Sequence, residues 1–309
     1  MSDYASAASK ARRAHASVAR AESALSREPD SQALQIKLAA RARLAQRSRD
    51  ILQGVAIENH VELCNYRLVA EPGRKFALPH ISKSLLEYQY TFSQIYDALK
   101  NGAKQRTRIG NEAWNESLLE FGYSYSGSLG VVLLAPSERD FFEGTYDQAI
   151  DALFEVLDID SQDTVKDIAK SLGEAVIKRV HDWSKANVDG GFDVDVRWSR
   201  SDGKQRGQLV SVSHMEKIVE IISATSDDKV EDVDISGTLV GIDVLAGNFH
   251  FAVPDGDEYR GGLDDDFSRS QFVSVPGRYV ARMTKTTKVV YSTNKEETRF
   301  KLKSLQPDG

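Results

Sequence analysis

Residues 233–253, VDISGTLVGIDVLAGNFHFAV, decide the fold of the C-terminal third of this chain. Two β-rich runs flank a turn at residues 246–248, and the second run alternates Phe249 and Phe251 with a histidine and an alanine. That period of two predicts a strand with one buried face. Gly237 lies inside the first run, where a small barrel needs its strand to bend sharply.

The residues after this stretch complete a five-stranded pattern. We expect a short strand around Tyr259, a helix over about residues 264–272, and two strands at residues 278–290 and 298–305. Acidic residues at the start of that helix would favour its N-terminus. Three strands, a helix and two strands are the order of an OB-like small barrel, a fold suited to binding rather than to one chemistry. The sequence therefore predicts an OB- or SH3-like β-barrel over residues 227–309.

The first 56 residues predict an αα-hairpin with a coiled-coil-like seam. Apolar residues, mostly alanine, recur there at spacings of three and four, which favours close packing of one helix on another. Pro29 interrupts this pattern and suits the first turn of a second helix, which is expected to end near Gly54. The seam positions of the first helix are Tyr4, Ala7, Ala11, Ala14, Val18, Ala21 and Leu25.

This hairpin is basic, whereas the rest of the chain is acidic. Residues 1–55 hold ten Lys and Arg residues against five Asp and Glu residues, a charge of +5, and the whole chain carries −6. The remaining residues therefore sum to −11. Arg41 and Arg47 are candidate phosphate contacts on such an arm. A solvated or self-associating helix surface is the simpler interpretation, because the charges lie off the apolar seam.

Residues 57–226 show the mixed pattern of a central α+β domain with an antiparallel sheet. The expected strands are residues 61–69, 117–125, 129–134, 192–198 and 207–212. The expected helices are residues 79–101, 146–157, 161–186 and 213–223. Residues 225–232 are acidic and lack large apolar side chains, so we expect a linker to the barrel there.

Residues 125–130, YSGSLG, are the one motif-like stretch of the central region. Small residues between two strands can present backbone N–H groups to an anion, so Ser126 and Ser128 are candidate binding residues. The stretch lacks the lysine and the following helix of a P-loop, and its two glycines are too few for a dinucleotide fingerprint. A tight structural turn is the simpler interpretation.

The succession of elements around this turn resembles a group of uncharacterised bacterial proteins. It consists of a Gly-Ser turn into a buried strand, two helices, a tryptophan-bearing hairpin and a C-terminal small barrel. The resemblance covers residues 80–305 and implies no activity and no site residues.

The sequence contains no recognisable catalytic or metal-binding motif. Its single cysteine, Cys64, lies in a strand-like run and is expected to be a small buried thiol. The six histidines form no H-x-x-x-H or H-E-x-x-H pair, so we expect neither a metal nor another cofactor. Asp193 and Asp195 share one face of a predicted strand, as metal-binding carboxylates can, but the exposed face of a half-buried hairpin explains them equally well.

Length and composition are those of an ordinary globular protein of two or three domains. The longest apolar runs, such as residues 131–135, are far shorter than the roughly 20 residues of a membrane-spanning helix. Basic residues interrupt residues 7–21, where a secretory signal would be apolar. We therefore expect a cytoplasmic protein that does not bind membranes.

These observations favour a non-enzymatic binding or regulatory protein that acts through a protein partner or its own copies. The first alternative is a nucleic-acid-binding protein, which would use the basic hairpin and stack bases on Phe249, Phe251 and Tyr259. The alternation of the strand favours a core position for these aromatic residues. The second alternative is an enzyme with an inter-domain site that uses Asp193, Asp195 and His214.

Overall fold

The computed structural model describes residues 3–59, 61–71, 73–125, 129–136, 144–200, 203–265, 267–268, 272–293 and 295–308. The chain divides into two compact units, Met1–Ala224 and Thr225–Gly309. Within the described residues the fold is α+β, with a pair of N-terminal helices, an antiparallel sheet covered by further helices, and a closed β-barrel. This architecture confirms the fold class that the sequence predicts.

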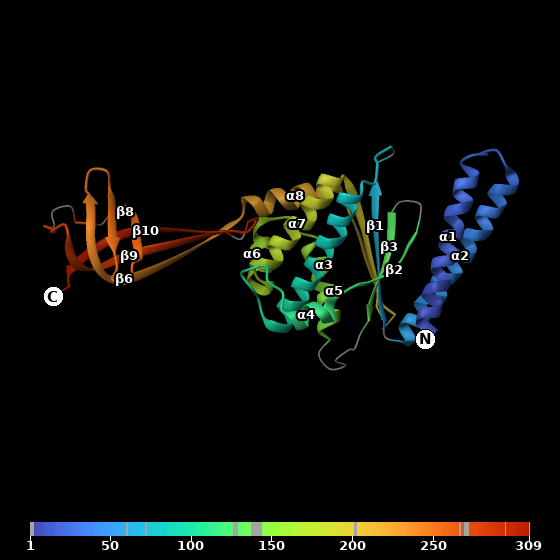
Figure 1. Cartoon of the computed structure of the whole chain (residues 1–309), viewed down its shortest axis with the longest axis horizontal. Helices are drawn as coiled ribbons and strands as arrows, with labels where there is room; N and C mark the ends of the chain where they lie inside the picture. The colour runs from blue at the N-terminus through green and yellow to red at the C-terminus, as the bar shows by residue number, and fades with distance from the viewer. Residues whose placement is uncertain are drawn as a thin grey trace. The chain divides into compact units, whose positions relative to one another are not determined.

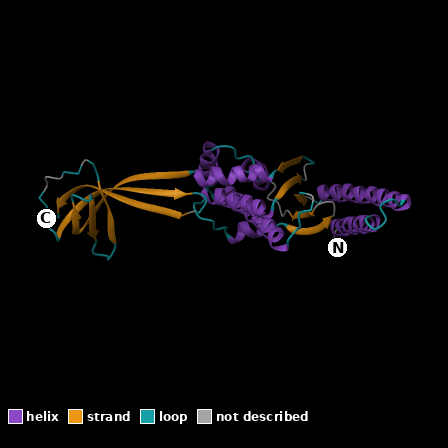
Figure 2. Ribbon diagram, turned by 90° about the horizontal axis from the view of Figure 1, so that it is seen from above, coloured by secondary structure: helices purple, strands orange, loops and turns teal. Residues whose placement is uncertain are grey.

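The two N-terminal helices, α1 (Asp3–Leu25) and α2 (Gln32–Glu58), lie side by side as an αα-hairpin (Figure 2). Small residues on both helices allow the close approach, and Ala11 and Ala45 are buried. The second helix continues past the expected end near Gly54, because its last two turns pack on the central sheet.

The central sheet has the strand order β2-β3-β1-β4-β5, and every adjacent pair is antiparallel. The strands are β1 (Val61–Ala70), β2 (Glu120–Tyr125), β3 (Leu129–Pro136), β4 (Phe192–Ser199) and β5 (Gln205–Val210). The helices that follow the hairpin are α3 (Leu78–Asn101), α4 (Asn111–Ser117), α5 (Thr145–Val156), α6 (Gln162–Leu172), α7 (Glu174–Gly190) and α8 (Val212–Ala224). The sheet lies between the hairpin on one side and these helices on the other (Figure 1).

The face of the sheet toward the helices is covered by buried side chains. Trp183 and Trp198 are fully buried, and their indole N–H groups donate to Tyr66 Oη at 3.0 Å and Tyr88 Oη at 2.9 Å. Cys64 is buried beside Tyr88, as the sequence predicts, and burial raises the pKa of its thiol to about 12. The thiol is therefore protonated near neutral pH and is a core residue rather than a nucleophile.

The face toward the hairpin is only partly covered. Leu52 and Ala56 of α2 pack with Leu63, Tyr123 and Val132 of β1, β2 and β3 in one apolar cluster. The rest of this face, along β1, β4 and β5, carries mostly polar side chains, with Leu209 exposed among them. The hairpin therefore closes one half of the face and leaves an opening over the other half.

Two expectations for the central region are wrong in detail. The single helix expected at residues 161–186 is divided into α6 and α7 at Gly173, which has a φ of +93°. A Cβ at this position would lie 2.4 Å from backbone atoms of Lys104, so only glycine lets the two segments approach. The strand expected from Ser117 begins at Glu120, because Ser117 ends the short helix α4.

The C-terminal unit is a closed barrel of the order β10-β8-β7-β6-β9, in which β8 and β10 are parallel. Its strands are β6 (Ser226–Asp243), β7 (Asn248–Ala252), β8 (Glu258–Leu263), β9 (Gly277–Val290) and β10 (Lys295–Pro307). Phe249 and Phe251 lie in its core with Met283 and Leu302. Among the described residues, no helix has both the length and the hydrophobicity that a membrane-spanning segment needs.

The linker expected at residues 225–232 is instead the first part of β6, which pairs with β9 from Ser226 onward. Its acidic residues meet basic residues across the strands. Lys303 Nζ lies 2.8 Å from Asp232 Oδ1, and Lys285 Nζ lies 3.8 Å from Glu231 Oε2. Cross-strand charge pairs thus complement the backbone pairing of a segment that has few apolar residues of its own.

The helix expected at residues 264–272 is also wrong for the part that the structure describes. Asp264 donates its backbone N–H to the Leu302 carbonyl at 2.9 Å, and residues 264, 265, 267, 268 and 272 are not helical. Phe267 is buried in the barrel core. Instead of a helix, the described part of this segment places the Phe267 side chain in the barrel core. Asp266 and residues 269–271 lie outside the described residues.

Candidate functional site: a cleft lined by arginines

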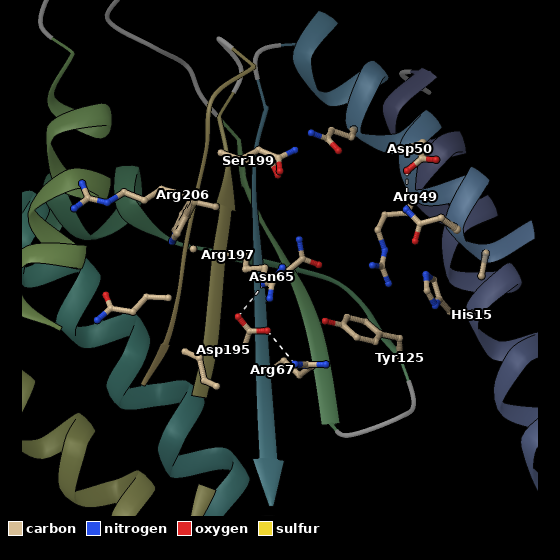
Figure 3. A pocket seen from close by; sticks show the side chains of 18 of the residues that line it. His15, Arg49, Asp50, Asn65, Arg67, Tyr125, Asp195, Arg197, Ser199 and Arg206 are labelled. Atoms are coloured by element: carbon tan, nitrogen blue, oxygen red, sulfur yellow. Dashed lines mark hydrogen bonds and ion pairs between the residues drawn. The ribbon is translucent and has the colours of Figure 1, made fainter. Parts of the chain in front are cut away.

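A cleft of about 950 Å³ lies between the hairpin and the uncovered half of the sheet face. Helix α2 supplies one wall, with Arg49 and Asp50, and strands β1 and β4 supply the other, with Arg67 and Arg197 (Figure 3). The volume is at the upper end of the range for sites that bind small molecules. All these residues belong to the N-terminal unit.

A buried carboxylate holds the two strand arginines in place. Asp195 is 5% exposed, and its two oxygens lie 3.0 Å from Arg67 Nη2 and 2.9 Å from Arg197 Nε. Arg67 lies directly opposite Asp195 in the β1–β4 register, and Arg197 is on the same face of β4. The carboxylate raises the pKa of Arg197 through this hydrogen bond and its charge. Each guanidinium has five N–H donors, so both keep donors for a ligand.

Tyr125 reaches the cleft across a glycine. A Cβ at Gly130 on the neighbouring strand would lie 2.1 Å from Tyr125 Cζ, so the ring can rest there only because position 130 has no side chain. The guanidinium carbon of Arg49 is 5.2 Å from the centre of the same ring, a cation–π contact. Figure 3 shows Arg49 extending from α2 toward the sheet and the Tyr125 hydroxyl pointing toward the side of Arg67.

His15 forms part of the wall beside these groups. Its ring stacks on Tyr123 with a centroid distance of 5.2 Å and lies 5.5 Å from Tyr125. Burial, and then the charge of Arg49, lower the pKa of His15 to about 4. His15 is therefore neutral near pH 7, and burial also raises the pKa of Tyr125, which keeps its hydroxyl protonated.

Four buried polar atoms around the cleft have no hydrogen-bond partner within the described part of the chain. They are His15 Nε2, Arg49 Nε, Asn65 Oδ1 and Arg67 Nε. An unsatisfied buried donor or acceptor costs about 1–3 kcal/mol, and a polar ligand in the cleft would satisfy such groups. The set contains N–H donors of two cations, one amide acceptor and one ring nitrogen of a neutral histidine.

The arginines make the cleft cationic. Arg49, Arg67 and Arg197 face two carboxylates, Asp50 and Asp195. Arg206 also contributes to the wall, but its guanidinium lies 3.0 Å from Asp151 Oδ1 and over the Phe154 ring, on the helix side of the sheet. The described residues hold no group of three or more His, Cys, Asp and Glu side chains placed to bind a metal ion.

None of the described residues proposed from the sequence as phosphate or base contacts lines this cleft. Arg41 donates to the Ser17 carbonyl at 3.0 Å and so ties α2 to α1, and Arg47 is exposed on the hairpin. Ser126 and Ser128 lie outside the described residues.

The candidate aromatic residues belong to the barrel core. Phe249 and Phe251 are 4% and 0% exposed, and Tyr259 packs against the same core, edge-on to Phe300 at 5.1 Å. Two of the three aromatic faces proposed to stack bases are therefore covered by the barrel itself. This burial argues against the nucleic-acid alternative, because stacking requires an accessible ring face.

The three residues of the enzyme alternative are held by different partners. Asp193 accepts a hydrogen bond from the Val212 N–H at 2.7 Å, at the start of α8. His214 Nε2 lies 3.1 Å from the Leu157 carbonyl oxygen. Asp195 faces the cleft between two arginines. Sequence reasoning identified Asp195, but it assigned this residue to a solvated face.

The other cleft residues were not identified from the sequence. Arg67 and Arg197 are 130 positions apart, and only the pairing of β1 with β4 brings them to one carboxylate. Two glycines of the sequence could have indicated these residues. A Cβ at Gly130 would press on Tyr125, and a Cβ at Gly207 would press on Arg197. A glycine opposite a long side chain on a sheet face indicates space that the side chain needs.

Comparison with known proteins adds no assignment. The chain matches no protein-family model, and no similar protein was found among curated proteins or solved structures.

Proposed function

We propose that this is a non-enzymatic binding protein whose ligand is anionic and occupies the cleft between the hairpin and the sheet. The observation that carries this proposal is the convergence of Arg49, Arg67 and Arg197 from three separate elements on one cleft. Guanidinium groups bind phosphate and carboxylate oxygens through charge-assisted, often bidentate hydrogen bonds.

The states of the acid–base groups in the cleft favour binding over catalysis. Asp195 accepts from two guanidinium groups, so each of its oxygens is already paired with a cation. The pKa of His15 is lowered to about 4, far from the range in which a general base works best near neutral pH. Both groups therefore support the arginines or the wall rather than transfer protons.

The proposal is tested with pyrophosphate as the probe and calorimetric titration of the full chain at low salt. We expect one equivalent to bind, with an affinity that falls as salt increases. Arg67→Gln and Arg197→Gln should each weaken binding about tenfold, since each removes a charge-assisted contact.

Arg43→Gln is the matched control, because Arg43 is an exposed hairpin residue that does not line the cleft. It removes the same charge and should change the affinity by less than about twofold. The proposal is wrong if pyrophosphate does not bind, or if all three variants weaken it equally. Thermal melts of each variant distinguish lost binding from lost folding.

A second candidate function, self-association, rests on the outer face of α2. Ile36, Leu44 and Ile51 are 66%, 56% and 52% exposed, and their spacings of eight and seven put them on one side of the helix. The basic hairpin and the acidic remainder are complementary in charge. We propose that this face, the α2 stripe, docks on the acidic part of a second copy.

Light scattering of the full chain tests the α2 stripe. Leu44→Glu should convert a dimer to a monomer, while Lys37→Gln, a nearby change of surface charge, should lower association only slightly. A wild-type chain that stays monomeric at high concentration would overturn this candidate. Deleting the hairpin is a poor test, because it would uncover Leu63 and Val132 on the sheet.

A further inference from the structure

The unpartnered atoms of the cleft restrict the chemistry of its ligand. Arg49 Nε and Arg67 Nε are donors and call for acceptor oxygens, which any phosphate supplies. Asn65 Oδ1 is an acceptor and calls for a donor. An ionised phosphate oxygen has no donor, so Asn65 Oδ1 requires either a protonated phosphate oxygen or a hydroxyl elsewhere on the ligand.

The position of Asn65 puts this donor close to the anion. Asn65 pairs with Arg197 across β1 and β4, and Arg67 and Asp195 are the next pair on the same face. The distance between successive residues on one face of a strand is about 7 Å. A ligand that contacts Arg67, Arg197 and Asn65 together must therefore carry its donor within a few bonds of its phosphate, as a phosphorylated sugar does.

The end of the cleft beyond Arg197 carries amide and hydroxyl side chains, with Asp50 of α2 beside them. Ser199 and Gln205 form the next pair on this face of the sheet, and Gln53 of α2 lines the same cleft. Amide side chains offer both donors and acceptors, the combination that the edge of a nucleobase requires. The volume of about 950 Å³ also exceeds what a small inorganic anion needs.

We infer that the ligand is a nucleoside phosphate, with its phosphates at Arg49, Arg67 and Arg197, a ribose hydroxyl donating to Asn65 Oδ1, and its base toward Gln53, Ser199 and Gln205. This inference rests on the proposed anion-binding function and adds the ligand class. No covalent step is involved, and the complex is one of reversible binding.

The experiment compares three probes on the full chain by calorimetry: pyrophosphate, ADP and ribose 5-phosphate. ADP should bind at least about tenfold more tightly than pyrophosphate and than ribose 5-phosphate, because it alone fills both ends of the cleft. If pyrophosphate binds and ADP binds no better, the nucleoside inference is wrong and the anion-binding function stands. If neither binds, both fail.

Asn65→Ala separates the donor contact from the charge. It should reduce the preference for ADP over pyrophosphate by about fivefold or more and leave the pyrophosphate affinity within about twofold. Asn115→Ala, which removes an exposed amide on α4, is the control and should change neither value. An unchanged preference in Asn65→Ala, or ribose 5-phosphate binding as tightly as ADP, would overturn the assignment.

Discussion

The two faces of the central sheet are made by the same strands but serve different purposes. On β4, Trp198 points into the helical layer and is fully buried, whereas its neighbour Arg197 points into the cleft with its side chain 68% exposed. On β1, Tyr66 is likewise buried on the helix side, whereas Arg67 points into the cleft. Successive side chains of a strand point to opposite faces of the sheet. Adjacent residues can therefore contribute one to the stability of the core and the next to a binding site.

The two faces also differ in what their polar groups border, a buried core on one side and the cleft on the other. On the helix side, Tyr66 Oη accepts from Trp183 and is hydrogen-bonded to Ser84 at 2.7 Å inside the buried core. On the hairpin side, Asn65 Oδ1 and Arg67 Nε have no partner among the described residues. Changes on the helix side should therefore act on the free energy of unfolding, and changes on the hairpin side mainly on binding.

The largest expected effect is that of Trp198→Ala. It removes a fully buried indole and the hydrogen bond to Tyr88, and should lower the free energy of unfolding by about 3–5 kcal/mol. Urea denaturation measures this value. Arg197→Ala, one position away on the other face, should cost less, about 1–2 kcal/mol, because the buried Asp195 keeps Arg67 as a partner. Comparable losses in both variants would contradict the contrast between the faces.

The next effect concerns the contact between Gly130 and Tyr125. Gly130→Ala forces the Tyr125 ring off the strand and should cost about 1–3 kcal/mol of folding free energy. In a Tyr125→Ala background the same substitution should cost less than about 0.5 kcal/mol, because the ring it collides with is gone. Equal costs in both backgrounds would show that the ring position is not what requires glycine.

The smallest effect is a pH dependence that originates at His15. The folded state lowers the pKa of this group from 6.5 to about 4, so the unfolded chain binds the proton more readily. The stability from neutral His15 is complete above about pH 6.5 and is lost as the pH falls toward 4. We expect a loss of about 1–2 kcal/mol between about pH 7 and pH 5.

Urea denaturation of the wild type and of His15→Gln over this pH range measures the contribution. The variant has no titrating ring, so its stability should fall less over the same interval. Identical slopes for the two proteins would mean that another group causes the acid sensitivity.

Much of the fold follows from local patterns. The alternation of Phe249 and Phe251 predicts a barrel strand, and the alanine seam predicts the hairpin, because these periods directly reflect which side of an element is buried. The wrong expectations share another cause. In each case the local conformation depends on a contact with a residue far away in the sequence. Gly173 packs against Lys104, Asp232 pairs with Lys303, and the Asp264 N–H donates to the Leu302 carbonyl.

The sequence by itself determined which residues alternate between buried and exposed, and therefore the α+β class, the hairpin and the small barrel. Only the tertiary structure decided that Arg49, Arg67 and Arg197 face one cleft and that Asp195 is a buried carboxylate rather than a solvated one. The physical reason is that periodicity is a local property of the chain. A binding site depends on strand order and on the covering element, which here joins α2, β1 and β4 across about 150 residues of sequence.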